Sequence, residues 1–358
     1  MNIRKNISLK KYNTFRIDSK AKYFLLLNNL KQIAENREII KNEKILILGS
    51  GSNTLLLNDW DGIVLLPDFK GKSIIKETKE YIDIQIGSGE IWDEFVRWCV
   101  ANDYAGIENL VMIPGTIGGA VSQNISAYGQ NITDTLMNID TVNLETNERN
   151  TYLPSECGYE YRRSNFKNIW RNRIMIISAI FRLKKHTNEF ELRYHERAGR
   201  YGSILEELQS FAKEPYEIKD VMEAIIRQRS KRLPNVDEYG TCGSFFENPI
   251  VPKRKYLELS KKIVDLQAYP VENFPKQKNS SKDDEYVKIP AGRLLDELGW
   301  KGRWEGDVGV YDKHALCVVT NMKASGVEVK KFADKMKKDV KENFDVDLIP
   351  EVNILQPS

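Results

Sequence analysis

The sequence predicts an α+β protein of more than one domain, because strand-like and helix-like patterns follow one another irregularly along its 358 residues. Residues 81–86 (YIDIQI) alternate between apolar and polar side chains, which is typical of a half-buried strand. Residues 327–344 repeat apolar side chains at helical spacing, which is typical of an amphipathic helix. A chain of this length is sufficient for two or three domains with their own cores.

The remaining elements follow from the same patterns in chain order. A helix expected at 90–102 would place Ile91, Phe95 and Cys99 on one apolar face. Strands in the first half are expected at 43–48, 62–67, 81–86, 137–144 and 173–183. In the second half, helices are expected at 217–232, 289–298 and 327–344, and strands at 315–320 and 346–355.

The composition is that of an ordinary soluble protein, with 41% hydrophobic and 29% charged residues. Lysine and arginine number 54 against 51 acidic residues, a balance that predicts no nucleic-acid partner and is compatible with an anionic small molecule. No apolar segment is long enough to cross a bilayer, so we expect a cytoplasmic protein without a membrane partner. The four cysteines and three histidines show no metal-binding spacing, so we expect no metal site.

Residues 110–129 (LVMIPGTIGGAVSQNISAYG) are a glycine-rich stretch that we expect to lie at the centre of the functional site. Its glycines permit close approach of the backbone to a ligand, and its polar side chains can hydrogen-bond a flat or phosphorylated molecule. A string of turns would explain the same glycines. The residues singled out are Gly115, Gly118, Gly119, Ser122, Asn124, Tyr128 and Gly129.

A second glycine-rich segment follows the strand expected at 43–48. Successive exposed N–H groups and small hydroxyls can wrap an anion, so this segment resembles a phosphate-binding loop. The sequence lacks the GK[ST] of nucleotide triphosphatases, and a threonine stands where the third glycine of a Rossmann fingerprint would be. The residues of this segment are Gly49, Ser50, Gly51, Ser52, Asn53 and Thr54.

Seven motifs, taken together, resemble the UDP-N-acetylenolpyruvoylglucosamine reductase family, flavoenzymes of peptidoglycan precursor synthesis. They stand in the order NTFRI, LGSGSN, IPGTIGGAVSQNISAYG, YEYRRSNF, GSFFENP, AGRLLDELGWKG and PEV. The resemblance covers about residues 11–356. The tyrosine of SAYG and the long segment after Leu183 are similar to the form of the family with an extra substrate-closing loop.

The resemblance implies NADPH-dependent reduction of UDP-N-acetylglucosamine enolpyruvate to UDP-N-acetylmuramate through a non-covalently bound FAD. The FAD pyrophosphate needs many N–H donors in a small volume, which glycine-rich loops provide. The family also implies potassium as an assisting cation, for which the sequence shows no pattern. Residues implied to hold FAD are Gly49, Ser50, Gly51, Ser52, Asn53, Thr54, Pro114, Gly115, Gly118, Gly119, Ser122, Asn124, Tyr128 and Gly129.

Three residues match the catalytic groups of the family. Ser244 in GSFFENP matches the proton donor, a role that requires neighbouring charges because a serine is a very weak acid. Arg162 in YEYRRSNF, rather than its neighbour Arg163, matches the arginine that holds the substrate carboxylate. Glu351 in PEV completes the triad in a protonated or hydrogen-bonded form. Without the family, a turn serine and a solvated arginine are the simpler interpretations.

Cys242 stands two residues before Ser244 and is a rival nucleophile, although the sequence pairs it with no base. It is the only cysteine next to one of the matched catalytic residues.

Substrate contacts are also implied by the resemblance. Tyr194 in LRYHE matches the tyrosine that folds over the nucleotide, while Arg232 and Asn248 match contacts to the diphosphate. Arg232 stands where relatives commonly have lysine, so the charge is kept but the geometry of the contact changes. Trp304 and Phe274 also depart from the family pattern, which affects recognition of the sugar or the uridine and not the reaction.

The resemblance further implies a three-domain flavoenzyme with a two-part FAD-binding region of the PCMH/vanillyl-alcohol-oxidase type and a C-terminal α+β substrate domain. The expected limits are 1–69 with 345–358, then 70–230, then 231–344, and we expect a monomer.

Two other functions fit the glycine loops. One is another FAD-dependent oxidoreductase of the same fold that acts on a small alcohol or sugar; such enzymes often tether FAD through histidine or cysteine, which the stretch 110–129 lacks. The other is a non-catalytic nucleotide-binding module, which would leave Arg162, Ser244 and Glu351 without a purpose.

Overall fold

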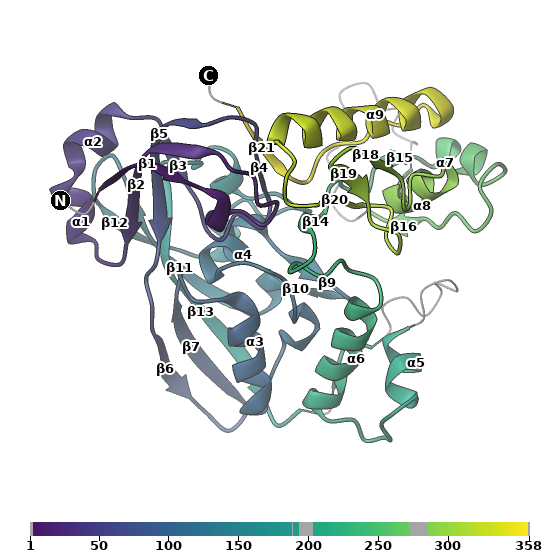
Figure 1. Cartoon of the computed structure of the whole chain (residues 1–358). Coiled ribbons are helices and arrows are strands. Elements are labelled where there is room, and N and C mark those ends of the chain that lie inside the picture. Colours follow the sequence, from purple (N-terminus) through teal and green to yellow (C-terminus); the bar gives the residue numbers. More distant parts are fainter. Residues whose placement is uncertain (1–2, 188, 193–202, 272–284, 357–358) are drawn as a thin grey trace. The chain divides into compact units, whose positions relative to one another are not determined.

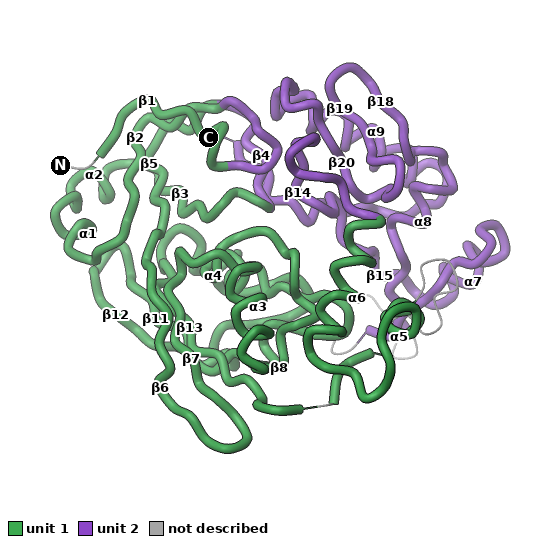
Figure 2. The backbone as a smooth tube through the Cα atoms, turned by 60° about the horizontal axis from the view of Figure 1, so that its bottom comes forward, with its two compact units in different colours: residues 1–12, 19–52, 59–231 green, residues 13–18, 53–58, 232–358 purple. Residues whose placement is uncertain are grey.

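The computed structural model describes residues 3–187, 189–192, 203–271 and 285–356. The chain divides into two compact units, coloured separately in Figure 2. Unit 1 comprises Met1–Tyr12, Ser19–Ser52 and Asp59–Lys231. Unit 2 comprises Asn13–Asp18, Asn53–Asn58 and Arg232–Ser358. Two short stretches from the first sixty residues therefore belong to the same unit as the C-terminal third.

The first sheet of unit 1 is four-stranded, in the order β1-β2-β5-β3. Strands β2, β5 and β3 are parallel and β1 is an antiparallel edge strand. Two short helices connect β2 to β3, as a parallel connection requires. The elements are β1 (Arg4–Ser8), η1 (Lys10–Tyr12), β2 (Lys20–Leu27), α1 (Lys31–Glu35), α2 (Arg37–Asn42), β3 (Ile45–Ile47) and β5 (Trp60–Pro67).

The second sheet of unit 1 is antiparallel, in the order β12-β11-β13-β7-β6, and the short β8 pairs with the end of β13. The strands are β6 (Lys72–Glu77), β7 (Tyr81–Gly87), β8 (Tyr104–Ala105), β11 (Leu136–Asn143), β12 (Arg149–Tyr152) and β13 (Ile174–Lys185). The predicted strands at 81–86, 137–144 and 173–183 are confirmed, with ends shifted by one or two residues.

Strand β13 contributes to two different cores because it contains a β-bulge. Ser178 is paired with Asp140 and Ile176 with Thr141, so Ile177 is the extra residue. Met175 and Ile177 pack with side chains of the first sheet, whereas residues further along β13 pack in the helix-covered core. The continuous apolar run of the sequence therefore reflects a strand that is buried on both faces.

Helices cover one face of this second sheet, as Figure 1 shows for α3 and α4. In α3, Trp92, Phe95 and Cys99 are buried, but the predicted Ile91 is 37% exposed because it precedes the helix in an extended conformation. In α6, which was predicted at 217–232, Val221 and Ile225 are buried. The helices are α3 (Trp92–Ala101), η2 (Glu108–Leu110), α4 (Ile117–Gln123), η3 (Ile132–Asp134), η4 (Pro154–Glu156), η5 (Asn165–Lys167), α5 (Ile204–Gln209) and α6 (Ile218–Ser230).

Unit 2 contains three small sheets and three helices among its described residues. The sheets have the orders β14-β20-β19-β18, β15-β17-β16 and β21-β4. The strands are β4 (Thr54–Leu56), β14 (Gly240–Ser244), β15 (Ile250–Pro252), β16 (Tyr269–Pro270), β17 (Tyr286–Lys288), β18 (Trp304–Glu305), β19 (Val308–Val310), β20 (Cys317–Thr320) and β21 (Asn353–Leu355). The helices are α7 (Lys253–Leu259), α8 (Ala291–Glu297) and α9 (Gly326–Phe344).

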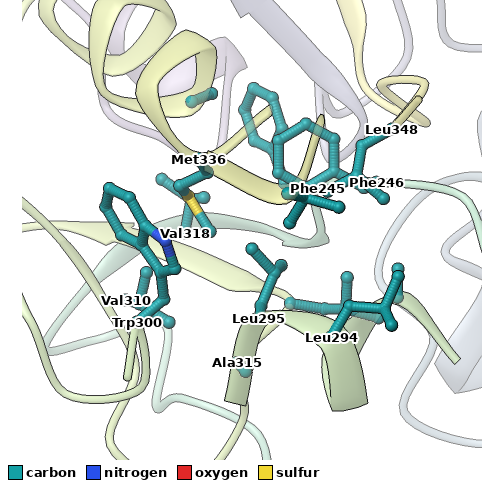
Figure 3. Packing of buried hydrophobic residues seen from close by; sticks show 14 of the residues in the cluster. Phe245, Phe246, Leu294, Leu295, Trp300, Val310, Ala315, Val318, Met336 and Leu348 are labelled. Atoms are coloured by element: carbon teal, nitrogen blue, oxygen red, sulfur yellow. The ribbon is translucent and has the colours of Figure 1, made fainter. Parts of the chain in front are cut away.

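The core of unit 2 is built on α9, which covers β19 and β20 (Figure 3). Phe332, Met336 and Val340 are buried on one side of α9, as the helical spacing predicted. Trp300 packs edge-on against Phe332 with ring centroids 5.4 Å apart, and its indole Nε1 donates to Asp339 Oδ2 at 2.8 Å. Phe15 and Leu55, from the two early stretches, belong to the same core.

The strand predicted at 346–355 is shorter in the structure. Only Asn353–Leu355 forms a strand, which pairs in parallel with β4. Residues 346–352 alternate between buried and exposed side chains, which explains the prediction, but a single bridge between Phe246 and Pro350 replaces a ladder. Two hydrogen bonds flank this bridge, from the Glu247 N–H to the Ile349 carbonyl and from the Glu351 N–H to the Phe245 carbonyl, both at 2.9 Å.

The α+β prediction is confirmed, since largely antiparallel sheets in both units carry helices on their faces. Among the helices of the described residues, none is both long enough and apolar enough to cross a membrane.

Candidate functional site

The two glycine-rich segments meet within unit 1. Ser52 Oγ donates to the carbonyl of Pro114 at 3.0 Å. A Cβ atom on Gly115, whose φ is +132°, would lie 3.2 Å from Ser52 Oγ, and one on Gly49 would lie 3.0 Å from Thr116 Oγ1. Larger residues would push the two backbones apart. The glycines therefore keep both segments in close contact, as a shared binding loop requires.

The second segment is fastened to the residues that lead into α3. The Trp92 N–H donates to Gly115 O at 3.0 Å, and the Ile117 N–H donates to Glu90 O at 2.9 Å. Gly118 donates to Ser88 O at 2.9 Å, and a Cβ on Gly118 would lie 3.0 Å from the Ser88 Cβ. Backbone pairing thus fixes the loop from Gly115 to Gly118 over its whole length.

Two charged side chains hold Met112, which has a left-handed backbone at φ +60°. Asp93 Oδ1 accepts from the Met112 N–H at 2.5 Å, and Arg229 Nη2 donates to the Met112 carbonyl at 3.2 Å. A left-handed conformation is strained for methionine, so these contacts stabilise a conformation that the residue itself disfavours. No motif in the sequence marks Asp93 or Arg229.

Helix α4 connects the loop to the segment that carries Arg162. Thr116 caps the helix by accepting from Gly119 N at 3.3 Å, and Asn124 ends it at φ +50°. Asn124 Nδ2 donates to Glu160 O at 2.8 Å, and the Ser122 carbonyl accepts from Ser164 Oγ at 2.6 Å. The predicted residues Ser122 and Asn124 therefore lie against the turn that precedes Ser164.

A tight hairpin follows α4, formed by β9 (Ser126–Ala127) and β10 (Gln130–Asn131). Its two central residues, Tyr128 and Gly129, have φ values of +49° and +84°, as a type I′ turn requires. The predicted residues Tyr128 and Gly129 are therefore the turn itself.

A buried polar network, missed from the sequence, holds this hairpin. Asn109 Nδ2 donates to Tyr128 O at 2.8 Å, and the Asn109 N–H donates to Gln130 Oε1 at 2.9 Å. Gln130 Nε2 in turn donates to Glu108 Oε1 at 2.7 Å. Glu108 and Asn109 are fully buried. The only sequence signal was a polar pair in front of the apolar run LVMI.

The structure distinguishes Arg162 from Arg163. Both belong to a tight turn closed by hydrogen bonds between the backbones of Glu160 and Arg163, with Arg162 at φ +56°. Arg162 Nη1 donates to Ser126 Oγ at 2.6 Å, so its guanidinium faces the glycine-rich stretch. The side chain of Arg163 is exposed, and its Nη1 lies 3.9 Å from Glu160 Oε2. Arg162 is thus the arginine that the fold directs toward the predicted FAD-binding residues.

The meeting point of the two segments fits an anionic group. Among the described residues, Ser50 Oγ is buried at this point and has no hydrogen-bond partner. A Cβ on Gly115 would lie 3.8 Å from this hydroxyl. An unsatisfied buried hydroxyl is costly unless a ligand supplies its partner. Gly49 to Ser52 belong to unit 1, while Asn53 and Thr54 of the same segment belong to unit 2.

Unit 2 brings two predicted catalytic residues together. Ser244 ends β14 after Gly243, a glycine at φ +71° where the pairing with β20 is irregular. The N–H of Glu351 donates to the carbonyl of Phe245 at 2.9 Å, so Glu351 is fixed beside the residue that follows Ser244. Asn53 Nδ2 donates to the Glu351 carbonyl at 3.2 Å. The backbone of Glu351 is therefore held on both sides.

Cys242 is a poor nucleophile in this environment. Its thiol is buried, and burial raises the pKa of Cys242 to about 12. A hydrogen bond with the Thr14 hydroxyl at 3.6 Å opposes this shift only in part, and the thiol donates to the Thr54 carbonyl at 3.5 Å. At neutral pH the thiolate, which is the nucleophilic form, is therefore rare.

The predicted substrate contacts fall in different places. Asn248 Oδ1 accepts from the N–H of Ala291 at 3.0 Å, so this side chain caps α8. Arg232 is half-buried at the start of the long stretch of unit 2. Trp304 is 41% exposed and lies tilted against Tyr239. Tyr194 and Phe274 lie outside the described residues.

No group of three or more histidine, cysteine or acidic side chains in the described part of the chain is arranged to hold a metal ion.

Comparisons with known proteins give a family match for two separate parts of the chain. A family model described as "FAD binding domain" matches residues 22–147, and one described as "UDP-N-acetylenolpyruvoylglucosamine reductase, C-terminal domain" matches residues 235–355. A UDP-N-acetylenolpyruvoylglucosamine reductase from Flavobacterium johnsoniae is 38% identical over 99% of this chain and 100% of its own. One from Bacteroides fragilis is 34% identical over 97% and 98%.

Among solved structures, the UDP-N-acetylenolpyruvylglucosamine reductase of Thermus caldophilus has a similar fold. Its TM-score is 0.64 at 19% identity, and the match covers 98% of each chain.

Proposed function

The chain belongs to the UDP-N-acetylenolpyruvoylglucosamine reductase family, and we propose that Arg162, Ser244 and Glu351 are the groups that act on its substrate. The enzyme is an FAD-containing oxidoreductase of peptidoglycan precursor synthesis, which reduces UDP-N-acetylglucosamine enolpyruvate to UDP-N-acetylmuramate with NADPH. The observation that carries this function is 38% identity to such an enzyme over 99% of the chain. The chemistry that FAD supplies when bound is hydride transfer from NADPH to the enolpyruvyl group.

The two glycine-rich segments of unit 1 would hold the FAD. Their contact through Ser52 and Pro114 lies beside the buried Ser50 hydroxyl, which would supply a polar partner to a pyrophosphate. The remaining cofactor residues predicted from the sequence are proposed to line the same surface, because Ser122 lies in the last turn of α4 and Asn124 caps the end of that helix.

Arg162 is proposed to bind the substrate carboxylate. Reduction of the vinyl group places developing negative charge on the carboxylate side of the substrate. A guanidinium held in one orientation can pair with both carboxylate oxygens and stabilise that charge without reorganising. The contacts of Arg162 with Ser126 and the left-handed turn support this role, since both restrict the side chain.

Ser244 is proposed to give a proton to the carbon next to the carboxylate, and Glu351 to assist. The Phe245 carbonyl and the Asn53 amide fix the backbone of Glu351, so its carboxyl is presented from a rigid position. General acid catalysis by a positioned group typically contributes about 10²–10⁴-fold to a rate. The rival Cys242 is disfavoured by its buried thiol.

Several finer assignments are part of the same proposal. Tyr194, Arg232 and Asn248 are assigned to the nucleotide part of the substrate, and potassium to an assisting role. The enzyme is assigned to the cytoplasm. The three-domain division is assigned from the family, with limits at 69/70, 230/231 and 344/345.

Absorption spectroscopy of the purified protein tests the function directly. We expect a yellow protein whose visible flavin absorbance bleaches with NADPH and returns when UDP-N-acetylglucosamine enolpyruvate is added under anaerobic conditions. A yellow protein that bleaches but is reoxidised only by oxygen would contradict the substrate assignment. A colourless protein that does not take up FAD would contradict the cofactor assignment as well.

A further inference from the structure

We propose that Ser126 is a positioning residue that sets the direction of the Arg162 guanidinium. The inference rests on the proposed function, because Arg162 binds the substrate carboxylate there. Ser126 accepts from both ends of the guanidinium: Nη1 donates to its hydroxyl at 2.6 Å and Nη2 to its carbonyl at 3.4 Å. A single residue thereby restricts the rotation of the guanidinium plane.

The backbone of Arg162 cannot supply this orientation by itself. Its φ of +56° is a conformation that non-glycine residues adopt rarely, at the second central position of the turn 160–163. Lys167 Nζ donates to the Arg162 carbonyl at 2.8 Å and holds the backbone there. The arginine side chain still has four rotatable bonds beyond Cα, so a contact at its far end is needed to fix the guanidinium.

Ser126 is suited to this task because it is itself rigidly held. It lies in β9, opposite Asn131 in a hairpin whose type I′ turn determines the register. The buried Asn109 fixes the turn by donating to the Tyr128 carbonyl. A chain of contacts therefore runs from the core of unit 1 through the hairpin to the tip of Arg162.

The two contacts to Ser126 use only part of the donor capacity of a guanidinium. Such a group carries five N–H donors, and these contacts need one from each terminal nitrogen. Because a planar guanidinium presents donors in a fixed fork, locking its plane also locks the direction in which an incoming carboxylate is received.

Two variants separate this role from a general contribution to the fold. Ser126→Ala removes the hydroxyl acceptor, and Ser126→Thr keeps it on a side chain that suits a strand. Each is compared with wild type by anaerobic rapid mixing in two half-reactions, which are reduction by NADPH and reoxidation by UDP-N-acetylglucosamine enolpyruvate. Titration of the oxidised enzyme with UDP-N-acetylmuramate gives the affinity for the carboxylate independently of turnover.

For Ser126→Ala we expect about a tenfold loss in reoxidation and in affinity for UDP-N-acetylmuramate, as for a hydrogen bond to a charged group. Reduction by NADPH and FAD content should stay at wild-type values, and Ser126→Thr should recover most of the loss. In an Arg162→Lys background, Ser126→Ala should have little further effect, since the guanidinium is gone.

Three results would overturn the proposal. They are unchanged reoxidation in Ser126→Ala, an equal loss in both half-reactions, and an undiminished effect in the Arg162→Lys background. If Ser126→Ala does not fold, Ser126→Thr and Ser126→Cys decide, because the thiol is a weak acceptor and must show the selective loss. A wild-type enzyme that the enolpyruvyl nucleotide does not reoxidise would instead overturn the proposed function itself.

Discussion

The glycine-rich region of unit 1 and the Ser244–Glu351 region of unit 2 are held by different kinds of contact. In unit 1, side chains stabilise unusual backbone: Asp93 and Arg229 hold Met112, and Asn109 holds Tyr128. Left-handed non-glycine residues in this region are Met112, Asn124, Tyr128 and Arg162. In unit 2, the Glu351 N–H donates to the Phe245 carbonyl, and the Glu351 carbonyl accepts from the side-chain amide of Asn53.

This difference follows from the task proposed for each region. A backbone that offers its N–H groups to a ligand cannot spend them in a strand ladder, so other contacts must fix its shape. A region that offers side chains can keep its backbone groups in hydrogen bonds, as the Glu351 N–H does with the Phe245 carbonyl. We therefore expect variants that reshape the backbone of the glycine-rich segments in unit 1 to affect FAD binding, and variants of the catalytic side chains in unit 2 to affect the chemical step with FAD still bound.

We expect the largest effect, on the rate of reoxidation, from Ser244→Ala. Removing the proton donor should slow reoxidation by the enolpyruvyl substrate by about 10²–10⁴-fold. FAD content and the rate of reduction by NADPH should not change. Anaerobic stopped-flow measurement of both half-reactions checks this. Cys242→Ala is the matched control and should keep its reoxidation rate; if it loses as much as Ser244→Ala, the thiol and not the hydroxyl acts on the substrate.

A smaller effect is expected where the two glycine segments meet. Gly115→Ala places a Cβ 3.2 Å from Ser52 Oγ at φ +132°, so FAD affinity should fall at least about tenfold. Gly71→Ala is the control, because Gly71 has φ +115° and no atom within 4 Å of the added Cβ. Fluorescence titration of the apoproteins with FAD measures both. Equal losses would attribute the effect to backbone strain and not to close approach.

Asp93→Ala should weaken FAD binding less than Gly115→Ala does. The change leaves the Met112 N–H without its acceptor, which costs about 1–3 kcal/mol when the group is buried. Only part of this cost reaches the loop, so we expect the FAD dissociation constant to rise about fivefold. Glu94→Ala, an exposed neighbour on α3, should bind FAD like wild type. An Asp93→Ala protein with unchanged affinity would mean that Met112 does not shape the binding loop.

The smallest effect is expected on the free energy of unfolding, from Asp83 in strand β7 of the second sheet of unit 1. Hydrogen bonds from Arg182 lower the pKa of Asp83 below its ordinary value of 3.8. The carboxylate therefore stabilises the fold above that value, and the contribution is lost as pH falls through the lowered pKa. Because Arg182 is 37% exposed, Asp83→Asn should cost only about 1 kcal/mol at pH 7.

Urea unfolding at pH 7 and pH 3 measures this difference, which should be smaller at pH 3. Asp61→Asn is the control because its side chain is 83% exposed. A cost for Asp83→Asn that did not change with pH would assign the effect to packing.

Local patterns were sufficient to predict most elements but not their special geometry. Alternation identified β7, and helical spacing identified α9 with its buried Phe332, Met336 and Val340. The same alternation misled at 346–352, where side chains alternate but the backbone pairs only through a single bridge between Phe246 and Pro350. Pairing depends on partners distant in sequence, which a local pattern does not contain.

The candidate site shows the same limit. Glycines and the seven motifs pointed to the loops and to Arg162, Ser244 and Glu351. The groups that hold them could not be predicted, because Asp93, Asn109 and Ser126 are ordinary polar residues whose importance arises from contacts made only after folding. Asn248 shows a contact of the same kind: its Oδ1 accepts from the N–H of Ala291 at the start of α8, a contact that the motif GSFFENP does not indicate.

The interleaving of the chain between the two units has a consequence for protein engineering. Phe15, Leu55 and Leu57 complete the core of unit 2, and β4 is the parallel neighbour of β21. A fragment that begins at residue 232 would expose this apolar surface and leave the last strand unmatched. We expect such a fragment to aggregate when expressed alone, and to become soluble only when the first sixty residues are supplied on the same polypeptide or in trans.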